Sequence, residues 1–136
     1  MIKDIVKDQF FLQQKSIDAT KEDLPVVQDL LDTIQAHETC VGIAANMIGE
    51  LKNIIVVYDG KQYLVLINPQ MIQAHKPLYT CQEGCLCHED LKETKRYEKI
   101  KVKYLDQDFR PKIKTFDKQT AQIIQHEIDH CQGILI

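Results

Sequence analysis

The chain has 136 residues, of which 44% are hydrophobic and 27% are charged, and its formal net charge is −3 at pH 7. This length and composition predict one globular domain over residues 1–136. The slightly acidic charge argues against direct nucleic-acid binding, and the chain has no apolar run long enough to span a membrane. The N-terminus carries too many charges for a signal peptide, and the five cysteines are an odd number. We therefore expect a cytoplasmic protein.

The first third of the chain predicts an arm, a helix and a turn. Residues 1–19 are expected to form a short helix or an extended arm. Apolar residues recur at spacings of three and four over roughly 21–38, which is typical of an amphipathic helix. The small residues of segment 40–49 predict a tight turn that leaves room for another backbone to approach closely.

The rest of the chain predicts strands and one final helix. An Asp59-Gly60 pair between two β-branched runs indicates a hairpin. A helix is predicted at about 118–131, with Asp117 as its N-cap and Gly133 just beyond its end. Strands are predicted at residues 53–58, 62–68, 71–79, 95–104 and 112–116. This order predicts an α+β fold, with mostly antiparallel strands around the C-terminal helix and the N-terminal helix outside.

The predicted final helix contains the motif His126-Glu127-x-x-His130. Residues four positions apart lie on one face of a helix, so the two imidazoles could bind one metal ion. The glutamate between them is placed to act as a base on a metal-bound water. The alternative is an ordinary amphipathic helix with polar residues on its solvent face.

A third metal ligand is available about forty residues upstream, in the segment 83–89. Cys85 would complete a Cys-His-His site with one open coordination position. Cys87 and His88 remain alternatives on spacing alone. A reduced thiol and a surface histidine are the simpler interpretation of both.

Three segments resemble, in order, the three motifs of the peptide deformylase family. Residues 40–47 resemble Gly-x-Gly-aliphatic-Ala-Ala-x-Gln, although Cys40 and Met47 depart from it. Residues 83–87 resemble Glu-Gly-Cys-aliphatic followed by a small polar residue. Residues 125–133 match Gln-His-Glu-aliphatic-Asp-His-x-x-Gly at every position.

The resemblance implies a bacterial hydrolase that removes the N-formyl group from the N-terminal formyl-methionine of nascent polypeptides. Cys85, His126 and His130 would hold one divalent metal ion, Fe²⁺ first, with Zn²⁺, Ni²⁺ or Co²⁺ as substitutes. A metal-bound water would attack the formyl carbonyl, with Glu127 as general acid and base. The expected partner is an N-formylated peptide or nascent chain, near the ribosome, with no membrane involved.

The same resemblance implies further site residues. The main-chain N–H of Leu86 would stabilise the developing negative charge, and Gly42 would also take part in catalysis. Arg96 would hold the substrate backbone, or it would simply pair with a nearby acid. The substrate-binding residues implied in this way are Val41, Gly42, Met47, Glu83, Leu86, Arg96 and Ile123.

Several positions depart from the family. Met47 stands where the family has glutamine, and a thioether cannot donate a hydrogen bond, so we expect a slow enzyme. Gln122 and Gln119 precede His126 by one and two helical turns and predict a more polar methionine pocket than usual. The sequence also ends three residues after Gly133, where family members commonly continue.

Three other functions fit parts of the pattern. A hydrolase of the same fold could act on another N-acyl amide, in line with the altered first motif. A metal-holding module could bind peptide N-termini with little turnover, although it would not need Glu127. A general zinc peptidase fits less well, because such enzymes place the third ligand downstream of the second histidine, where only six residues follow.

Overall fold

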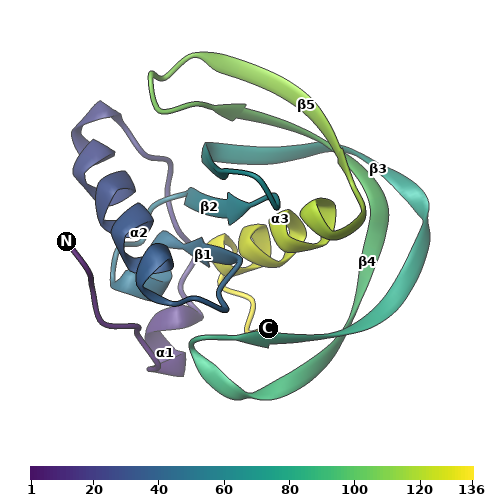
Figure 1. Cartoon of the computed structure of the whole chain (residues 1–136), viewed down its shortest axis with the longest axis horizontal. Helices are drawn as coiled ribbons and strands as arrows, with labels where there is room; N and C mark the ends of the chain where they lie inside the picture. Colours follow the sequence, from purple (N-terminus) through teal and green to yellow (C-terminus); the bar gives the residue numbers. More distant parts are fainter.

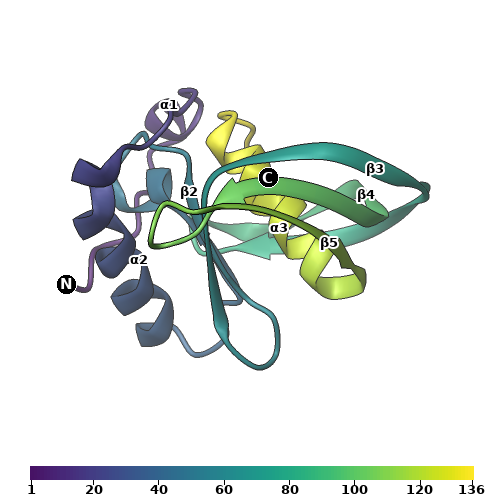
Figure 2. The same cartoon turned by 90° about the horizontal axis from the view of Figure 1, so that it is seen from above.

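A single antiparallel sheet, with strands in the order β1-β2-β3-β4-β5, bends around helix α3 (Figure 1). The computed structural model describes all 136 residues. The strands are β1 (Gly42–Ala44), β2 (Ile54–Tyr58), β3 (Tyr63–Cys85), β4 (His88–Leu105) and β5 (Pro111–Asp117). Helix α3 (Lys118–Cys131) follows β5 directly and lies between the curved strands in both views (Figure 2). The predicted α+β fold around a C-terminal helix is confirmed.

Strands β3 and β4 form one long hairpin that is bent at several points. The predicted break between a strand at 62–68 and another at 71–79 is wrong, because β3 continues through Pro69 to Cys85. The β3–β4 register shifts at four places, one of them between Ile67 and Gln70. Such shifts accommodate a proline and bend the strands. Residues 83–89, between the predicted strands at 71–79 and 95–104, form the tip of this hairpin, and Cys85 is the last residue of β3.

The N-terminal third covers the outer side of β1 and β2. A short helix, α1 (Gln9–Leu12), interrupts the extended arm, and α2 (Leu24–Ala36) forms the predicted amphipathic helix. A 3-10 turn at Lys21–Asp23 precedes α2, and the Thr20 side chain caps this turn. Helix α2 lies on the side of the sheet away from α3 (Figure 2). None of the three α-helices has the length and apolarity that a bilayer crossing requires.

The predicted turn at 40–49 holds more structure than expected. Strand β1 is followed by a second 3-10 turn, η2 (Ala45–Ile48), all four residues of which are buried. Gly49 ends this turn with a positive φ of 91°, a conformation that favours glycine. Because β1 pairs only with β2, its other edge is free.

Helix α3 is buried on nearly every side, although it carries many polar residues. Its buried residues include Gln125, His126, Glu127 and His130. Gln125 joins α3 to β4, because its amide accepts from the Tyr97 N–H at 2.8 Å and donates to the Tyr97 carbonyl at 2.9 Å. The sheet therefore removes these polar side chains from bulk water and fixes the rotation of the helix.

Candidate metal centre and catalytic cavity

Three candidate donor atoms come from two elements, and His130 Nε2 lies close to each of the other two. The Nε2 atoms of His126 and His130 lie 3.2 Å apart on one face of α3. The Cys85 Sγ, at the end of β3, lies 3.3 Å from His130 Nε2. Ligand atoms at about 2.1 to 2.3 Å from a tetrahedral ion lie roughly 3.4 to 3.6 Å from one another. Each of these two separations is close to the one expected between two ligands of a divalent ion of zinc or iron size.

The two alternative ligands at the hairpin tip lie in different surroundings. The Cys87 Sγ is buried and lies 3.1 Å from the Cys85 Sγ. The side-chain donors of Cys85, Cys87 and His130 all lie within 4.8 Å of one another. His88, in contrast, contacts a main-chain oxygen of Ile136. Cys87 is therefore close enough to compete as a ligand.

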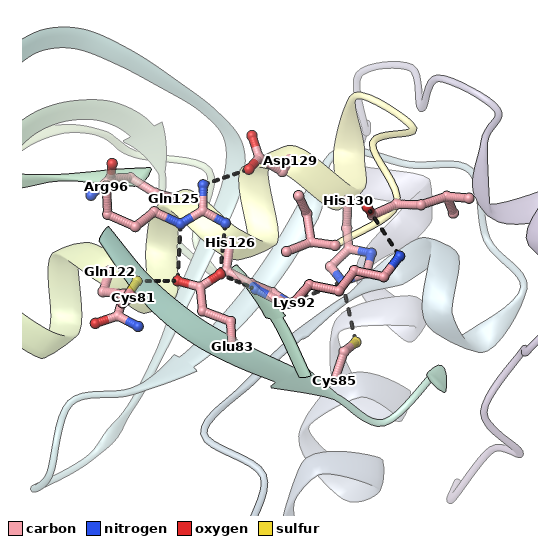
Figure 3. A network of polar contacts seen from close by, with 12 residues as sticks. Cys81, Glu83, Cys85, Lys92, Arg96, Gln122, Gln125, His126, Asp129 and His130 are labelled. Carbon is pink, nitrogen blue, oxygen red and sulfur yellow. Dashed lines mark hydrogen bonds and ion pairs between the residues drawn. The ribbon is translucent and has the colours of Figure 1, made fainter. Parts of the chain in front are cut away.

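A buried ion-pair network contacts His126 at Nδ1, the ring nitrogen that does not face His130 (Figure 3). The His126 Nδ1 donates to Glu83 Oε1 at 2.7 Å, and Arg96 donates to both oxygens of Glu83 at 2.7 and 3.0 Å. Arg96 also donates to Asp129 at 2.6 Å. A carboxylate on Nδ1 fixes the imidazole tautomer and directs Nε2 toward a metal ion.

The electrostatics of this network agree with its geometry. Burial alone would raise the pKa of Glu83, but hydrogen bonds from His126 and Arg96 outweigh it and lower the pKa to about 2. Burial lowers the pKa of His130 to about 3. At neutral pH Glu83 is therefore ionised and His130 is neutral, which is the form of imidazole that binds metals.

Glu127 is a buried carboxylate without a partner for one of its oxygens. Its exposed fraction is 3%, and its Oε1 makes no hydrogen bond. Burial raises the pKa of Glu127 to about 7. A group with a pKa near the working pH is suited to take up a proton and give it back.

Glu127 lies at the floor of a cavity of about 450 Å³. The walls come from the segment before and within β1 and from the tip of the β3–β4 hairpin, and α3 forms the floor. The lining residues are Thr39, Cys40, Val41, Gly42, Gln82, Glu83, Gly84, Cys85, Leu86, Gln119, Gln122, Ile123, His126 and Glu127. Most residues expected to bind substrate are therefore gathered around one cavity.

Two of the expected substrate-binding residues lie outside the cavity lining. Met47 is 1% exposed and packs in the core, where its Sδ accepts from the Ala44 N–H at 3.4 Å. The guanidinium of Arg96 is engaged by Glu83 and Asp129. Of the two roles expected for Arg96, this arrangement corresponds to pairing with nearby acids rather than to holding the substrate backbone.

Sequence reasoning missed Tyr79, whose hydroxyl donates to Gln122 Oε1 at 3.2 Å. Alternate residues of a strand share a face, and Tyr79, Cys81 and Glu83 follow that period on β3. The missed signal was this alternation, since Glu83 was already a candidate. Asn46, the neighbour of Met47, donates its side-chain amide to the His130 carbonyl at 3.0 Å.

Gly42 has no room for a side chain beside the catalytic carboxylate. A Cβ there would lie 2.6 Å from Ile123 Cγ2 and 2.7 Å from Glu127 Oε2. We expect Gly42→Ala to lower kcat/KM by about a hundredfold, because a displacement of about 1 Å has that effect. Overpacking would also lower the free energy of unfolding by about 1 to 3 kcal/mol.

The matched control is Gly60→Ala, at a position where nothing lies within 4 Å but φ is 97°. It should cost about 1 to 2 kcal/mol of backbone strain and leave kcat/KM unchanged. Steady-state kinetics and urea unfolding of both variants make the comparison. Full activity of Gly42→Ala would contradict the close packing of Gly42 on Glu127.

The family model for polypeptide deformylases matches residues 2–136. A peptide deformylase of Clostridium beijerinckii is 52% identical over 137 residues, covering 100% of both chains. A peptide deformylase of Brachyspira hyodysenteriae is 36% identical over 122 residues, covering 83% of this chain and 65% of that protein.

Solved structures give the same result. The peptide deformylase of Thermotoga maritima superposes with a TM-score of 0.91 at 28% identity, covering 99% of this chain and 95% of that one. A peptide deformylase from Synechococcus elongatus, solved in complex with actinonin, has a TM-score of 0.89 at 30% identity. That match covers 98% of this chain and 75% of the other.

Proposed function

The chain belongs to the polypeptide deformylase family, and on this premise we propose which of its residues perform the reaction. It is a metal-dependent hydrolase that removes the formyl group from the N-terminal methionine of nascent polypeptides. One observation carries the residue assignment. The Cys85 Sγ and the His126 Nε2 each lie close to His130 Nε2, and Cys85 and His126 line the same cavity as the unpartnered carboxylate of Glu127.

We propose that Cys85, His126 and His130 hold one divalent metal ion, with Fe²⁺ as the native ion. When bound, such an ion lowers the pKa of a water molecule and polarises the formyl oxygen. One thiolate with two imidazoles suits zinc and iron. Ni²⁺, Co²⁺ or Zn²⁺ would use the same donors. The Glu83 carboxylate keeps His126 oriented for this role.

Glu127 carries the proton transfers in this proposal. Its carboxylate takes a proton from the attacking water and delivers it to the leaving amine. The formyl C–N bond breaks, the formyl carbon gains the hydroxyl, and the products are formate and a free amino terminus. The pKa of Glu127, raised to about 7 by burial, supports both directions of transfer.

The main-chain N–H of Leu86, at the hairpin tip, is the proposed donor to the negative charge on the formyl oxygen. Because Gly42 has no side chain beside Glu127, a substrate could approach the Glu127 carboxylate closely. Met47 supplies no side-chain donor, because its thioether cannot donate. A slow chemical step is therefore expected.

The substrate backbone is proposed to add as a strand beside β1. This strand has a free edge, and Val41 and Gly42 line the cavity next to it. Extended peptides commonly bind to such edges through main-chain hydrogen bonds. Ile123 would contact the first side chain, whereas Arg96 would act indirectly, by holding Glu83.

Nascent chains near the ribosome are the proposed physiological substrate, in the cytoplasm. The formyl group marks a chain that has just begun, so the enzyme must meet its substrate close to synthesis. The five cysteines form no disulfides, which supports a reducing compartment.

The ligand assignment is tested by three cysteine variants. We expect Cys85→Ser to weaken metal binding by at least about a hundredfold, which exceeds the effect of losing an outer partner. Cys81→Ser, four residues earlier on the same strand, is the matched control and should bind metal like the wild type. Cys87→Ser tests whether the neighbouring Cys87 thiol, rather than that of Cys85, binds the metal.

The measurement is competition with a chelating dye under anaerobic conditions, followed by formate release from formyl-Met-Ala-Ser with Fe²⁺. One ion per chain and turnover that stops when a chelator removes the ion are the expected results. Loss of the ion in Cys87→Ser, with retention in Cys85→Ser, would overturn the ligand set.

A further inference from the structure

Gln122, in the lining of the cavity, is hydrogen-bonded to Tyr79, and the hydrolysis itself uses neither residue. Gln122 lies on α3 one turn before His126 and lines the cavity. The Tyr79 hydroxyl, from β3, donates to its Oε1 at 3.2 Å. In Figure 3, Gln122 lies at one end of the polar network, and Cys85 and His130 lie at the other.

The contact with Tyr79 fixes which end of the Gln122 amide is available to a ligand. Because Oε1 accepts from Tyr79, the amide nitrogen keeps both of its N–H donors. No hydrogen bond within the chain uses that nitrogen. The wall of the cavity therefore presents a donor that a bound acceptor would satisfy.

The first side chain of the substrate is the group that would meet this donor. The formyl group must lie near Glu127 and Cys85 for the reaction to occur. From Glu127 the cavity continues along α3 past Ile123 to Gln122, about 7 Å along the helix axis. An unbranched side chain with three rotatable bonds, such as that of methionine, suits this path.

The charges around the cavity restrict the kind of acceptor. No lysine or arginine lines it, and Glu83 and Glu127 both do. An anionic side chain would therefore lack a counter-ion and meet two carboxylates. Gln82, Gln119 and Thr39 add uncharged polar groups to the lining. The cavity thus favours a neutral acceptor.

We propose that Gln122, positioned by Tyr79, enables this enzyme to deformylate peptides whose first residue is N-formyl-methionine sulfoxide. The proposal rests on the deformylase function above. Synthesis supplies methionine at this position, and peroxide oxidises its thioether to a sulfoxide before the peptide reaches the enzyme. A sulfoxide oxygen is a neutral acceptor, whereas thioether sulfur is a weak one. Its burial requires a donor.

The reaction on this substrate is the same hydrolysis. Water adds a hydroxyl to the formyl carbon and a proton to the amine, and the C–N bond breaks. The products are formate and a peptide that begins with methionine sulfoxide. The sulfoxide itself is neither oxidised nor reduced, so the step needs no further reactant.

The test compares formyl-Met-Ala-Ser with its sulfoxide form on the same preparation of holoenzyme. The ratio of the two kcat/KM values does not depend on how much enzyme is folded or metal-loaded. For the wild type we expect the two values to agree within about threefold. For Gln122→Leu, kcat/KM for the sulfoxide peptide should be at least about tenfold lower than for the thioether peptide. A factor of this size corresponds to the loss of one hydrogen bond.

Two further variants test the arrangement. Tyr79→Phe removes only the orienting hydroxyl and should give a ratio between those of the wild type and Gln122→Leu. Gln73→Leu makes the same chemical change on β3 outside the cavity, and its ratio should equal that of the wild type.

Each outcome has a distinct meaning. Wild-type discrimination of more than tenfold against the sulfoxide, or an unchanged ratio in Gln122→Leu, would overturn this inference alone. Failure of the wild type to hydrolyse either peptide would overturn the deformylase function together with it.

Discussion

Glu127→Gln is expected to lower kcat/KM for a formyl-methionyl peptide by about three orders of magnitude, with one metal ion per chain retained. The glutamine has the same shape but cannot take up or return the proton. General acid and base catalysis by one residue contributes about 10² to 10⁴ in rate. Glu127 is not among the proposed ligands, so its loss should leave the ion in place. Formate release and metal analysis on one preparation measure both quantities.

The same substitution has a predictable effect on the stability of the metal-free protein. The pKa of Glu127 rises from 4.5 to about 7 on folding, because burial disfavours the charged form. The stability linked to the bound proton is fully present below pH 4.5 and is lost as the pH rises through about 7. Relative to wild type, Glu127→Gln should therefore gain up to about 3 kcal/mol between pH 5 and pH 8.

Glu98→Gln, on the exposed side of β4, is the matched control for both measurements. It should leave the rate and the pH dependence of unfolding unchanged. Retained turnover in Glu127→Gln would refute the proton-transfer role. A wild type that binds metal and formylated peptides without turnover, and an identical Glu127→Gln, would instead indicate a binding module.

The candidate metal ligands could be proposed from sequence, because their geometry is local or tied to a motif. His126 and His130 are four residues apart in a helix, and that spacing alone puts both imidazoles on one face. Cys85 was identified through the resemblance to a family, which the match over residues 2–136 confirms. Spacing alone left Cys87 open, and its Sγ does lie 3.1 Å from that of Cys85.

The other contacts around the cavity depend on pairings between distant segments, which no local sequence pattern encodes. Tyr79 and Gln122 are 43 residues apart, and the register shifts of β3 and β4 decide whether they meet. The family resemblance predicted that Met47 would contact substrate. In the structure Met47 lies in the turn η2 and its side chain is buried in the core. The break predicted between residues 68 and 71 is absent for a similar reason, because a register shift between Ile67 and Gln70 accommodates Pro69 within β3.

Arg96→Met is expected to lower the free energy of unfolding by about 3 to 5 kcal/mol. The Arg96 side chain is 6% exposed and that of Glu83 is 5% exposed, so the substitution leaves a buried carboxylate without its main counter-ion. Lys112→Met is the matched control, because Lys112 pairs with Asp106 at 3.9 Å on the surface. Its cost should stay below about 1 kcal/mol. Urea unfolding at pH 7 measures both.

A second substitution separates the lost ion pair from lost packing. Glu83→Gln in the Arg96→Met background removes the unpaired charge, so it should recover part of the stability. The cost of the pair of substitutions should therefore be smaller than the sum of the two single costs. Additive costs would show that Arg96 acts through packing alone.

The pH dependence of Arg96→Met ties this network to the metal centre. In the wild type, the lowered pKa of Glu83 contributes stability that is present above pH 4.5 and is lost as the pH falls toward 2. Without Arg96 that pKa rises, so acid should unfold the variant at a higher pH. Glu83 also holds the His126 Nδ1, so metal affinity should fall by about 10- to 100-fold. Unchanged metal affinity in a folded variant would show that His126 keeps its orientation without the Arg96–Glu83 pair.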